Sequence, residues 1–168
     1  KPVVTRFMST DGGGGERLAA VSAGVYRTYY AQAGDGWKID AKHANVPDEC
    51  SKSAGDVEVF RELKGRENEL GRAVEVKNKP VERSDIQDSI TKAKQAGLGE
   101  YLFVIGDGWQ SETEKQNGLN EIKSTSVELI IIYPEELLSM LKFVGEAGRI
   151  EFTRVVGEYL NDMRATSA

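Results

Sequence analysis

The chain has 168 residues, of which 39% are hydrophobic and 29% charged, and this composition is ordinary for a soluble protein of one domain. Its net charge of −5 argues against a protein that coats nucleic acid, because such proteins are usually basic, but it allows local phosphate contacts by lysine and arginine. No apolar run is long enough to span a bilayer, and the single cysteine and single histidine exclude an internal disulfide and a multi-histidine zinc site. We therefore expect a cytoplasmic protein with one domain over residues 1–168. Lys1 is not an initiator methionine, which allows a fragment of a longer chain.

The first regular element that the sequence predicts is a helix beginning near Glu16. Before it, Gly12–Gly15 favour a flexible approach, because consecutive glycines lose much backbone entropy in regular structure. Apolar residues then recur at helical spacing up to about Gly34, and they are Leu18, Val21, Val25 and Tyr29. Glu16 lies in the first turn, where a negative charge suits the helix dipole.

A short strand is predicted over residues 36–40, and the stretch from 43 to 53 is irregular because Pro47 interrupts regular structure. This stretch is rich in hydrogen-bonding side chains, namely Asn45, Asp48, Ser51 and Ser53. Such side chains commonly cap turns. The alternative is that they line an approach to the strand that follows.

Two five-residue runs, 55–59 and 73–77, alternate apolar and charged residues, which is typical of strands buried on one face. Asp56 lies on the first run. Glu75 and Lys77 lie on the second and point the same way, because side chains two apart on a strand share a face. If the two strands pair across a wide hairpin connection, a carboxylate from the first meets a carboxylate and an ammonium group from the second.

Paired carboxylates of this kind suggest a metal site. Two carboxylates in a partly buried site repel each other, and a cation is the usual means of neutralising them. Asp56 and Glu75 would suit Mg²⁺, a hard ion that polarises a phosphoryl oxygen and activates water. Lys77 would position or deprotonate the water, or stabilise developing charge. The alternative is a cross-strand charge pair on a solvated sheet face, which is common.

A helix is predicted over residues 84–96, opened by a capping box of Ser84 and Gln87 and followed by Gly97. Its apolar stripe consists of Ile86, Ile90 and Ala93. Its opposite side carries the polar residues Gln87, Thr91 and Lys94. This polar side either borders a site or is simply a solvated face.

The continuous apolar run over residues 101–105 predicts a strand that is covered on both faces, and the largely apolar residues 127–133 predict another buried strand. The polar residues 106–126 between them favour either a recognition loop or a surface insertion. Pro134 opens a short helix, and a long amphipathic helix follows with apolar positions over 152–163. This order of elements predicts an α/β fold with a mixed central β-sheet flanked by α-helices.

The arrangement of Asp56, Glu75 and Lys77 resembles the PD-(D/E)XK nuclease superfamily, in which an Asp begins one strand and Glu-X-Lys lies on the next. A wider pattern is similar to the SacI-type branch of type II restriction endonucleases. The residues that carry it run from His43 through Asp56, continue with Val74-Glu75-Val76-Lys77-Asn78-Lys79, and include a helix and the strand at 101–105. The resemblance covers most of the chain, from about Gly12–Gly15 to the C-terminal helix. Gly55 replaces the proline of the motif, a departure that does not touch the metal ligand itself.

The resemblance implies a Mg²⁺-dependent endodeoxyribonuclease that hydrolyses phosphodiester bonds in duplex DNA, with Mn²⁺ able to replace Mg²⁺. It implies a bacterial restriction–modification enzyme that acts as a homodimer, so that each site cuts one strand. The implied metal ligands are Asp56, Glu75 and the carbonyl of Val76, the residue acting on water is Lys77, and the auxiliary acid is Glu16. The expected DNA contacts are Asn45, Ser51, Ser53, Lys79, Gln87 and Lys94.

Two alternatives stay open at this point. Another nuclease of the superfamily, such as a repair or junction-resolving enzyme, would share the three residues and differ in substrate. A non-catalytic binding module would have the same strands without a metal site, because one fold hosts many functions.

Overall fold

The computed structural model describes residues 2–9, 16–32, 34, 36–41, 53–63 and 68–166. Its strands are β1 (Trp37–Ala41), β2 (Val57–Arg61), β3 (Glu69–Lys77), β4 (Glu100–Ile105) and β5 (Glu128–Ile132). Its helices are α1 (Pro2–Ser9), α2 (Glu16–Gln32), α4 (Arg83–Gln95), α5 (Glu112–Ser124), α6 (Pro134–Ser139) and α7 (Gly145–Thr166), with a short 3-10 helix η1 (Met140–Lys142). Within these ranges, no helix has the length and apolar character that crossing a membrane requires.

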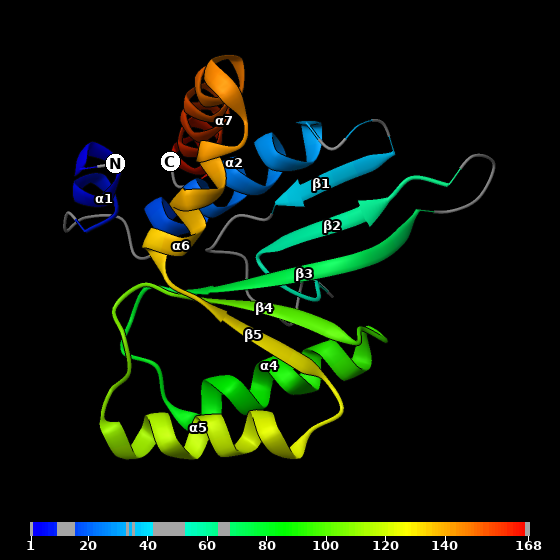
Figure 1. The fold of residues 1–168 in the computed structure, drawn as a ribbon, viewed down its shortest axis with the longest axis vertical. Coiled ribbons are helices and arrows are strands. Elements are labelled where there is room, and N and C mark those ends of the chain that lie inside the picture. The colour runs from blue at the N-terminus through cyan, green and yellow to red at the C-terminus, as the bar shows by residue number, and fades with distance from the viewer. Residues whose placement is uncertain are drawn as a thin grey trace.

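The strands form one mixed sheet in the order β1-β2-β3-β4-β5, so each strand lies beside its neighbours in the sequence (Figure 1). β1, β2 and β3 pair antiparallel, whereas β4 runs parallel to β3 and β5 runs parallel to β4. Parallel neighbours need crossover connections, and α4 and α5 provide them. The predicted α/β fold with a mixed central sheet flanked by helices is therefore confirmed.

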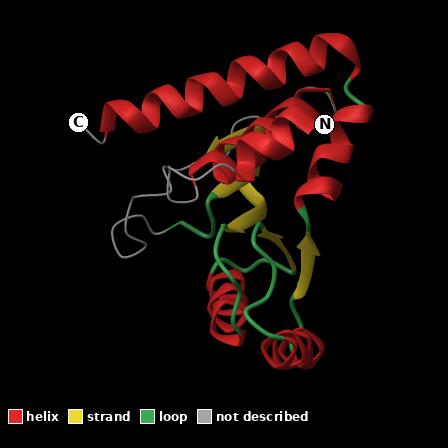
Figure 2. Ribbon diagram, turned by 90° about the vertical axis from the view of Figure 1, so that its left-hand side faces the viewer, coloured by secondary structure: helices red, strands yellow, loops and turns green. Residues whose placement is uncertain are grey.

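Helices cover the two faces of the sheet as separate layers (Figure 2). α2 and α7 pack together on one side, and α4 and α5 pack together on the other (Figure 1). β3 contributes to both cores, because Val74 packs in the cluster that contains α2 and Ala73 packs in the cluster that contains α4. Side chains alternate along a strand, so Glu75 and Lys77 lie on the same face as Ala73, toward α4.

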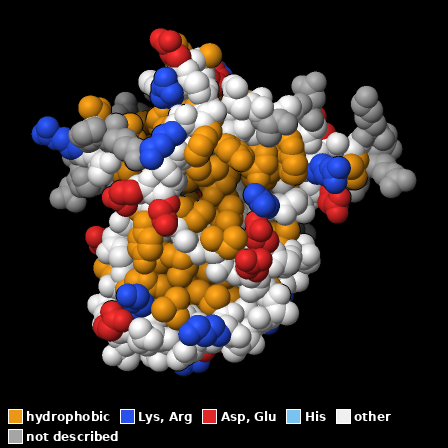
Figure 3. Space-filling view, in the orientation of Figure 1, with side chains coloured by type: hydrophobic (Ala, Val, Ile, Leu, Met, Phe, Trp, Pro, Cys, Tyr) orange, Lys and Arg blue, Asp and Glu red, His pale blue; other side chains and the backbone are white. Residues whose placement is uncertain are grey.

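The strand β5 ends the sheet, and its outer edge has no partner strand among the described residues. Its residues Ile130, Ile131 and Ile132 are half-buried, and Tyr133 after it is exposed. In the orientation of Figure 1, Figure 3 shows hydrophobic side chains gathered over the middle of the molecule's visible surface, where β5 and α6 lie. Such a surface around an open sheet edge is of a kind that favours association between chains.

The polar residues 106–126 contain the helix α5, which the sequence did not predict, and whether the segment contacts DNA stays open. Ser111 caps the helix, its hydroxyl accepting a hydrogen bond from the backbone N–H of Glu114. The helix packs on α4, where a Cβ at Gly118 would lie 3.3 Å from Ile86 Cγ1, and on the Trp109 ring, which would lie 2.7 Å from the same Cβ. Tertiary packing therefore stabilises a helix whose own sequence has few apolar positions.

The start of α4 also differs from the sequence expectation. The helix begins at Arg83, with Glu82 as its N-cap residue. The carboxylate of Asp85 reaches back and accepts a hydrogen bond from the backbone N–H of Glu82, at 3.1 Å. The predicted capping box of Ser84 and Gln87 is therefore wrong, because an acid one residue after Ser84 already fulfils that role.

Candidate active site

Asp56 is held against β3 by its own side chain. It lies just before β2, and its Oδ2 accepts a hydrogen bond from the backbone N–H of Val76 at 2.7 Å. Gly55 makes this approach possible, because a Cβ there would lie 2.7 Å from the carbonyl oxygen of Val74. The structure therefore brings Asp56 beside the Glu75–Lys77 segment of the neighbouring strand, and the predicted pairing of the two strands is confirmed.

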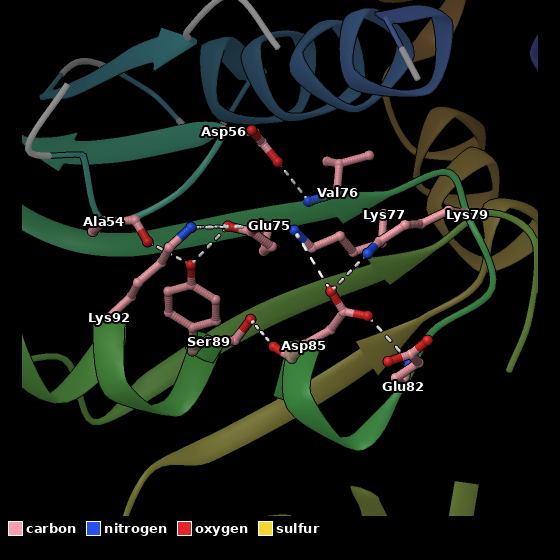
Figure 4. A network of polar contacts seen from close by, with 11 residues as sticks. Ala54, Asp56, Glu75, Val76, Lys77, Lys79, Glu82, Asp85, Ser89 and Lys92 are labelled. Carbon is pink, nitrogen blue, oxygen red and sulfur yellow. Dashed lines mark hydrogen bonds and ion pairs between the residues drawn. The ribbon is translucent and has the colours of Figure 1, made fainter. Parts of the chain in front are cut away.

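Glu75 is buried, with 4% of its surface exposed, and its carboxylate is surrounded by donor groups (Figure 4). Lys77 Nζ lies 2.8 Å from Oε1, and Lys92 Nζ lies 3.4 Å from Oε1 and 3.2 Å from Oε2. The Tyr101 hydroxyl is 3.3 Å from Oε2 and also hydrogen-bonds to the carbonyl oxygen of Ala54. Because an unpaired buried charge is costly, these contacts offset the burial of the carboxylate.

The two carboxylates of the site act on each other. Burial, and then the neighbouring charge of Glu75, raise the pKa of Asp56 from its ordinary value of 3.8 to about 6, against the lowering effects of Lys77 and Lys92. Burial lowers the pKa of Lys77, but its contacts with carboxylates, Glu75 first, together outweigh burial and raise it. The acid pair thus carries a repulsion that a bound cation would relieve.

A third carboxylate, that of Asp85 on α4, lies on the other side of Lys77. It is buried, and its Oδ1 is 4.0 Å from Lys77 Nζ and 3.4 Å from Lys79 Nζ. The Ser89 hydroxyl donates to the backbone carbonyl of Asp85 at 2.9 Å (Figure 4). Lys77 therefore lies between two buried carboxylates, and the side chain of Lys79, a predicted DNA contact, is 62% exposed beside them.

Sequence reasoning missed the side chains by which α4 reaches the site. Asp85, Ser89 and Lys92 share one face of the helix, because they are spaced by four and three residues. The predicted contacts Gln87 and Lys94 lie about half a turn away from that face and are exposed. The detectable signal is the polar series at positions 85, 89 and 92, which borders the apolar stripe of the helix.

Hydrogen bonds fix the segment that leads to Asp56. The Ser53 hydroxyl donates to the carbonyl oxygen of Gly55 at 2.7 Å, and the Ala54 N–H donates to Glu58 Oε1 at 2.8 Å. Ser53, Glu58 and Lys92 also line a cavity of about 510 Å³ beside the site. Lys92 therefore has this cavity on one side and Glu75 on the other.

Glu16 is half-buried and opens α2. A Cβ at Gly106 would lie 2.5 Å from Leu18 Cδ2 and 3.2 Å from the carbonyl oxygen of Lys77, so the first turn of α2 lies beside the end of β3. The structure thus brings the helix start to the strand that carries Lys77, and the role of Glu16 as an auxiliary acid stays a prediction. Two predicted DNA contacts, Asn45 and Ser51, lie outside the described residues.

The oxygen donors of the site fit a hard divalent ion. Mg²⁺ is usually bound through one or two carboxylates and keeps several waters, and Asp56, Glu75 and the Val76 carbonyl are donors of this kind. The pKa of Asp56 is raised first by burial and then by the charge of Glu75, and such an ion would relieve the repulsion between the two carboxylates. In the part of the chain that the structure describes, no three His, Cys, Asp or Glu side chains form a metal-binding group. The described residues therefore offer a site of two carboxylates, which substrate and water would complete.

The matched family covers the segment that carries these residues. Residues 1–107 match the family model described as the SacI restriction endonuclease C-terminal domain. This range is well over half of the chain and includes Asp56, Glu75, Lys77, α4 and β4. No curated protein matches the chain.

Proposed function

The chain belongs to the SacI restriction endonuclease C-terminal domain family, and we propose that it is itself a Mg²⁺-dependent endodeoxyribonuclease. Its reaction would be hydrolysis of phosphodiester bonds in duplex DNA at a short target, as in a type II restriction endonuclease with a PD-(D/E)XK site. The observation that carries the proposal is that two paired strands bring Asp56 and Glu75 together, with Lys77 Nζ 2.8 Å from Glu75.

The residues of the site have separate tasks in this proposal. Asp56, Glu75 and the Val76 carbonyl would hold Mg²⁺, or Mn²⁺ in its place, and the bound ion would polarise a phosphoryl oxygen and make a water more acidic. Lys77 would orient the attacking water and stabilise the negative charge that develops on the phosphate. The water oxygen would bond to phosphorus and release a proton to solvent, while the bond from phosphorus to the leaving oxygen breaks and that oxygen takes up a proton from solvent.

The positions of the proposed DNA-contacting residues support some of these assignments better than others. Lys79 is best supported, because its exposed side chain lies within 3.4 Å of Asp85, next to Lys77. Gln87 and Lys94 are exposed on the far side of α4 and would meet phosphates further from the scissile bond. The remaining proposed contacts are Ser53 and, outside the described residues, Asn45 and Ser51. We further propose a homodimer that works in the cytoplasm.

Cleavage of DNA is the direct test. The purified protein is incubated with a set of plasmids that together contain every six-base-pair sequence, with Mg²⁺ or Mn²⁺ and with EDTA. We expect defined fragments that depend on the metal, and sequencing of their ends gives the target. Glu75→Gln is the matched control, because it removes one charged ligand and keeps the side-chain shape. Absence of cleavage with both metals would contradict the proposal.

One observation favours the alternative of a non-catalytic DNA-binding module. Both oxygens of Glu75 are already contacted by ammonium groups, so the carboxylate has partners without a metal. Calorimetry with Mg²⁺ and Mn²⁺ separates the two functions. A nuclease should show metal binding that Glu75→Ala abolishes, whereas a binding module should bind DNA with no metal heat. Cutting of branched but not linear DNA would instead indicate a junction-resolving nuclease.

A further inference from the structure

The helix α4 places a second lysine against the central carboxylate of the site. Lys92 Nζ contacts both oxygens of Glu75, at 3.4 Å and 3.2 Å, and Lys77 Nζ lies 2.8 Å from Oε1. Both lysine side chains are largely buried, with 20% of Lys92 and 26% of Lys77 exposed. Figure 4 shows Lys92 and Lys77 approaching Glu75 from different elements, the one from α4 and the other from β3.

From this geometry we propose that Lys92 is a positioning residue, which holds the Glu75 carboxylate in place so that Lys77 is available to the substrate. The inference rests on the proposed nuclease function and deepens it. If Lys77 orients the attacking water, its ammonium group must be able to move away from Glu75, which it contacts before substrate binds. Were Lys77 the sole cation at Glu75, its turn toward substrate would leave a buried carboxylate without a compensating charge, at a high cost.

The surroundings of the two lysines support this division of roles. Lys77 lies between Glu75 and Asp85, and Asp85 also has Lys79 at 3.4 Å and the backbone N–H of Glu82 at 3.1 Å. Lys77 therefore belongs to a charge network with Asp85 and Lys79, and the Lys79 side chain is 62% exposed. Lys92 reaches Glu75 from α4 (Figure 4). The Tyr101 hydroxyl joins the same carboxylate to the Ala54 carbonyl.

A positioning role makes a prediction that a general packing role does not make. Lys92 is a cation beside a proposed metal ligand, so it must weaken metal binding while it orients the ligand. We expect Lys92→Met to bind Mn²⁺ several-fold more tightly than the wild type and yet to cleave DNA at least tenfold more slowly at saturating metal and DNA. If Lys92 only packed against its neighbours, its substitution would lower both the Mn²⁺ affinity and the cleavage rate.

The first experiment needs no activity and no metal. Melting temperatures in EDTA are measured for the wild type, Lys92→Met, Glu75→Gln and the double variant. We expect Lys92→Met to lower the melting temperature by roughly 4 °C or more in the wild-type background and by less than half as much in the Glu75→Gln background. Lys123→Met, an exposed lysine in the last turn of α5, is the matched control and should change it by less than about 1 °C. Equal losses in both backgrounds would overturn the inference.

The second experiment measures single-turnover cleavage and Mn²⁺ affinity for the same variants. Lys92→Arg, which keeps the charge, should recover most of the rate that Lys92→Met loses, and Lys123→Met should match the wild type. A rate for Lys92→Met within twofold of the wild type, or weaker Mn²⁺ binding together with the slower rate, would overturn the positioning role. If the wild type itself does not cleave, the proposed function fails, and the melting temperatures alone then decide whether Lys92 holds Glu75.

Discussion

The clearest physical consequence of the paired, buried carboxylates is the raised pKa of Asp56. Its pKa in the folded protein is about 6, above the ordinary 3.8, so the folded state binds this proton more tightly than the unfolded chain does. The contribution of Asp56 to stability is therefore most favourable below pH 3.8, and it is lost as the pH rises to about 6. At neutral pH without metal, the ionised Asp56 costs the fold up to roughly 3 kcal/mol.

We accordingly predict that Asp56→Asn abolishes cleavage and stabilises the metal-free protein at pH 8. At pH 3.5 the two proteins should have similar stability, because Asp56 is protonated in both states there. Denaturant unfolding in EDTA at the two pH values measures the difference. An equal difference at both pH values would show that the ionisation of Asp56 is not its cause.

Two possible roles of Glu16 predict different effects of the Glu16→Gln substitution on cleavage. A charge that only suits the dipole of α2 is worth well under about 1 kcal/mol, so Glu16→Gln would leave cleavage unchanged. A carboxylate that acts at the metal site would, when neutralised, slow cleavage at limiting Mg²⁺ more than tenfold, or about 1.4 kcal/mol. We predict the larger effect, because the first turn of α2 lies beside the end of β3. Rates within a factor of two of the wild type across a Mg²⁺ titration would remove Glu16 from the site.

The turn before β2 and the strand β3 must approach closely for the carboxylates to meet. A Cβ at Gly55 would lie 2.7 Å from the Val74 carbonyl oxygen and 3.2 Å from the Tyr101 hydroxyl. We predict that Gly55→Ala keeps the fold, at a cost of about 1–3 kcal/mol, and lowers the cleavage rate at least tenfold because Asp56 is displaced. Gly99→Ala is the control, since a Cβ there meets nothing within 4 Å. Circular dichroism and single-turnover rates check both variants, and a normal rate for Gly55→Ala would mean that the close approach is dispensable.

Periodicity predicted the elements whose apolar residues follow one face, and it missed those stabilised mainly by their neighbours. The sequence runs that contain Asp56 and Glu75 alternate clearly, so both the pairing and the shared face of Glu75 and Lys77 could be foreseen. α5 has few apolar positions and forms because it packs on α4, which no local pattern reveals. The contact of Lys92 with Glu75 depends on how α4 docks on the sheet, so the sequence alone could not place it.

The charge of the whole molecule bears on how it could meet DNA. A net charge of −5 repels phosphates at long range, so attraction must come from local groups. Lys77, Lys79 and Lys92 gather around the buried acids and would supply such a field at the site itself. A bound divalent ion would add to it, and we therefore expect Mn²⁺ to raise the DNA affinity of the wild type but not that of the Glu75→Gln variant.

The proposed homodimer predicts how the two DNA strands are cut. One chain has one candidate site, so a two-fold dimer would place one site on each strand. We predict that a heterodimer of wild-type and Glu75→Gln subunits, isolated through two different affinity tags, nicks supercoiled plasmid to the open circle, whereas the wild-type dimer produces linear DNA. Agarose gels separate the two products, and sedimentation velocity at the same protein concentration gives the mass. Linear DNA as the first product of the heterodimer, or a monomer at the concentration that cuts, would mean that one site cuts both strands in turn.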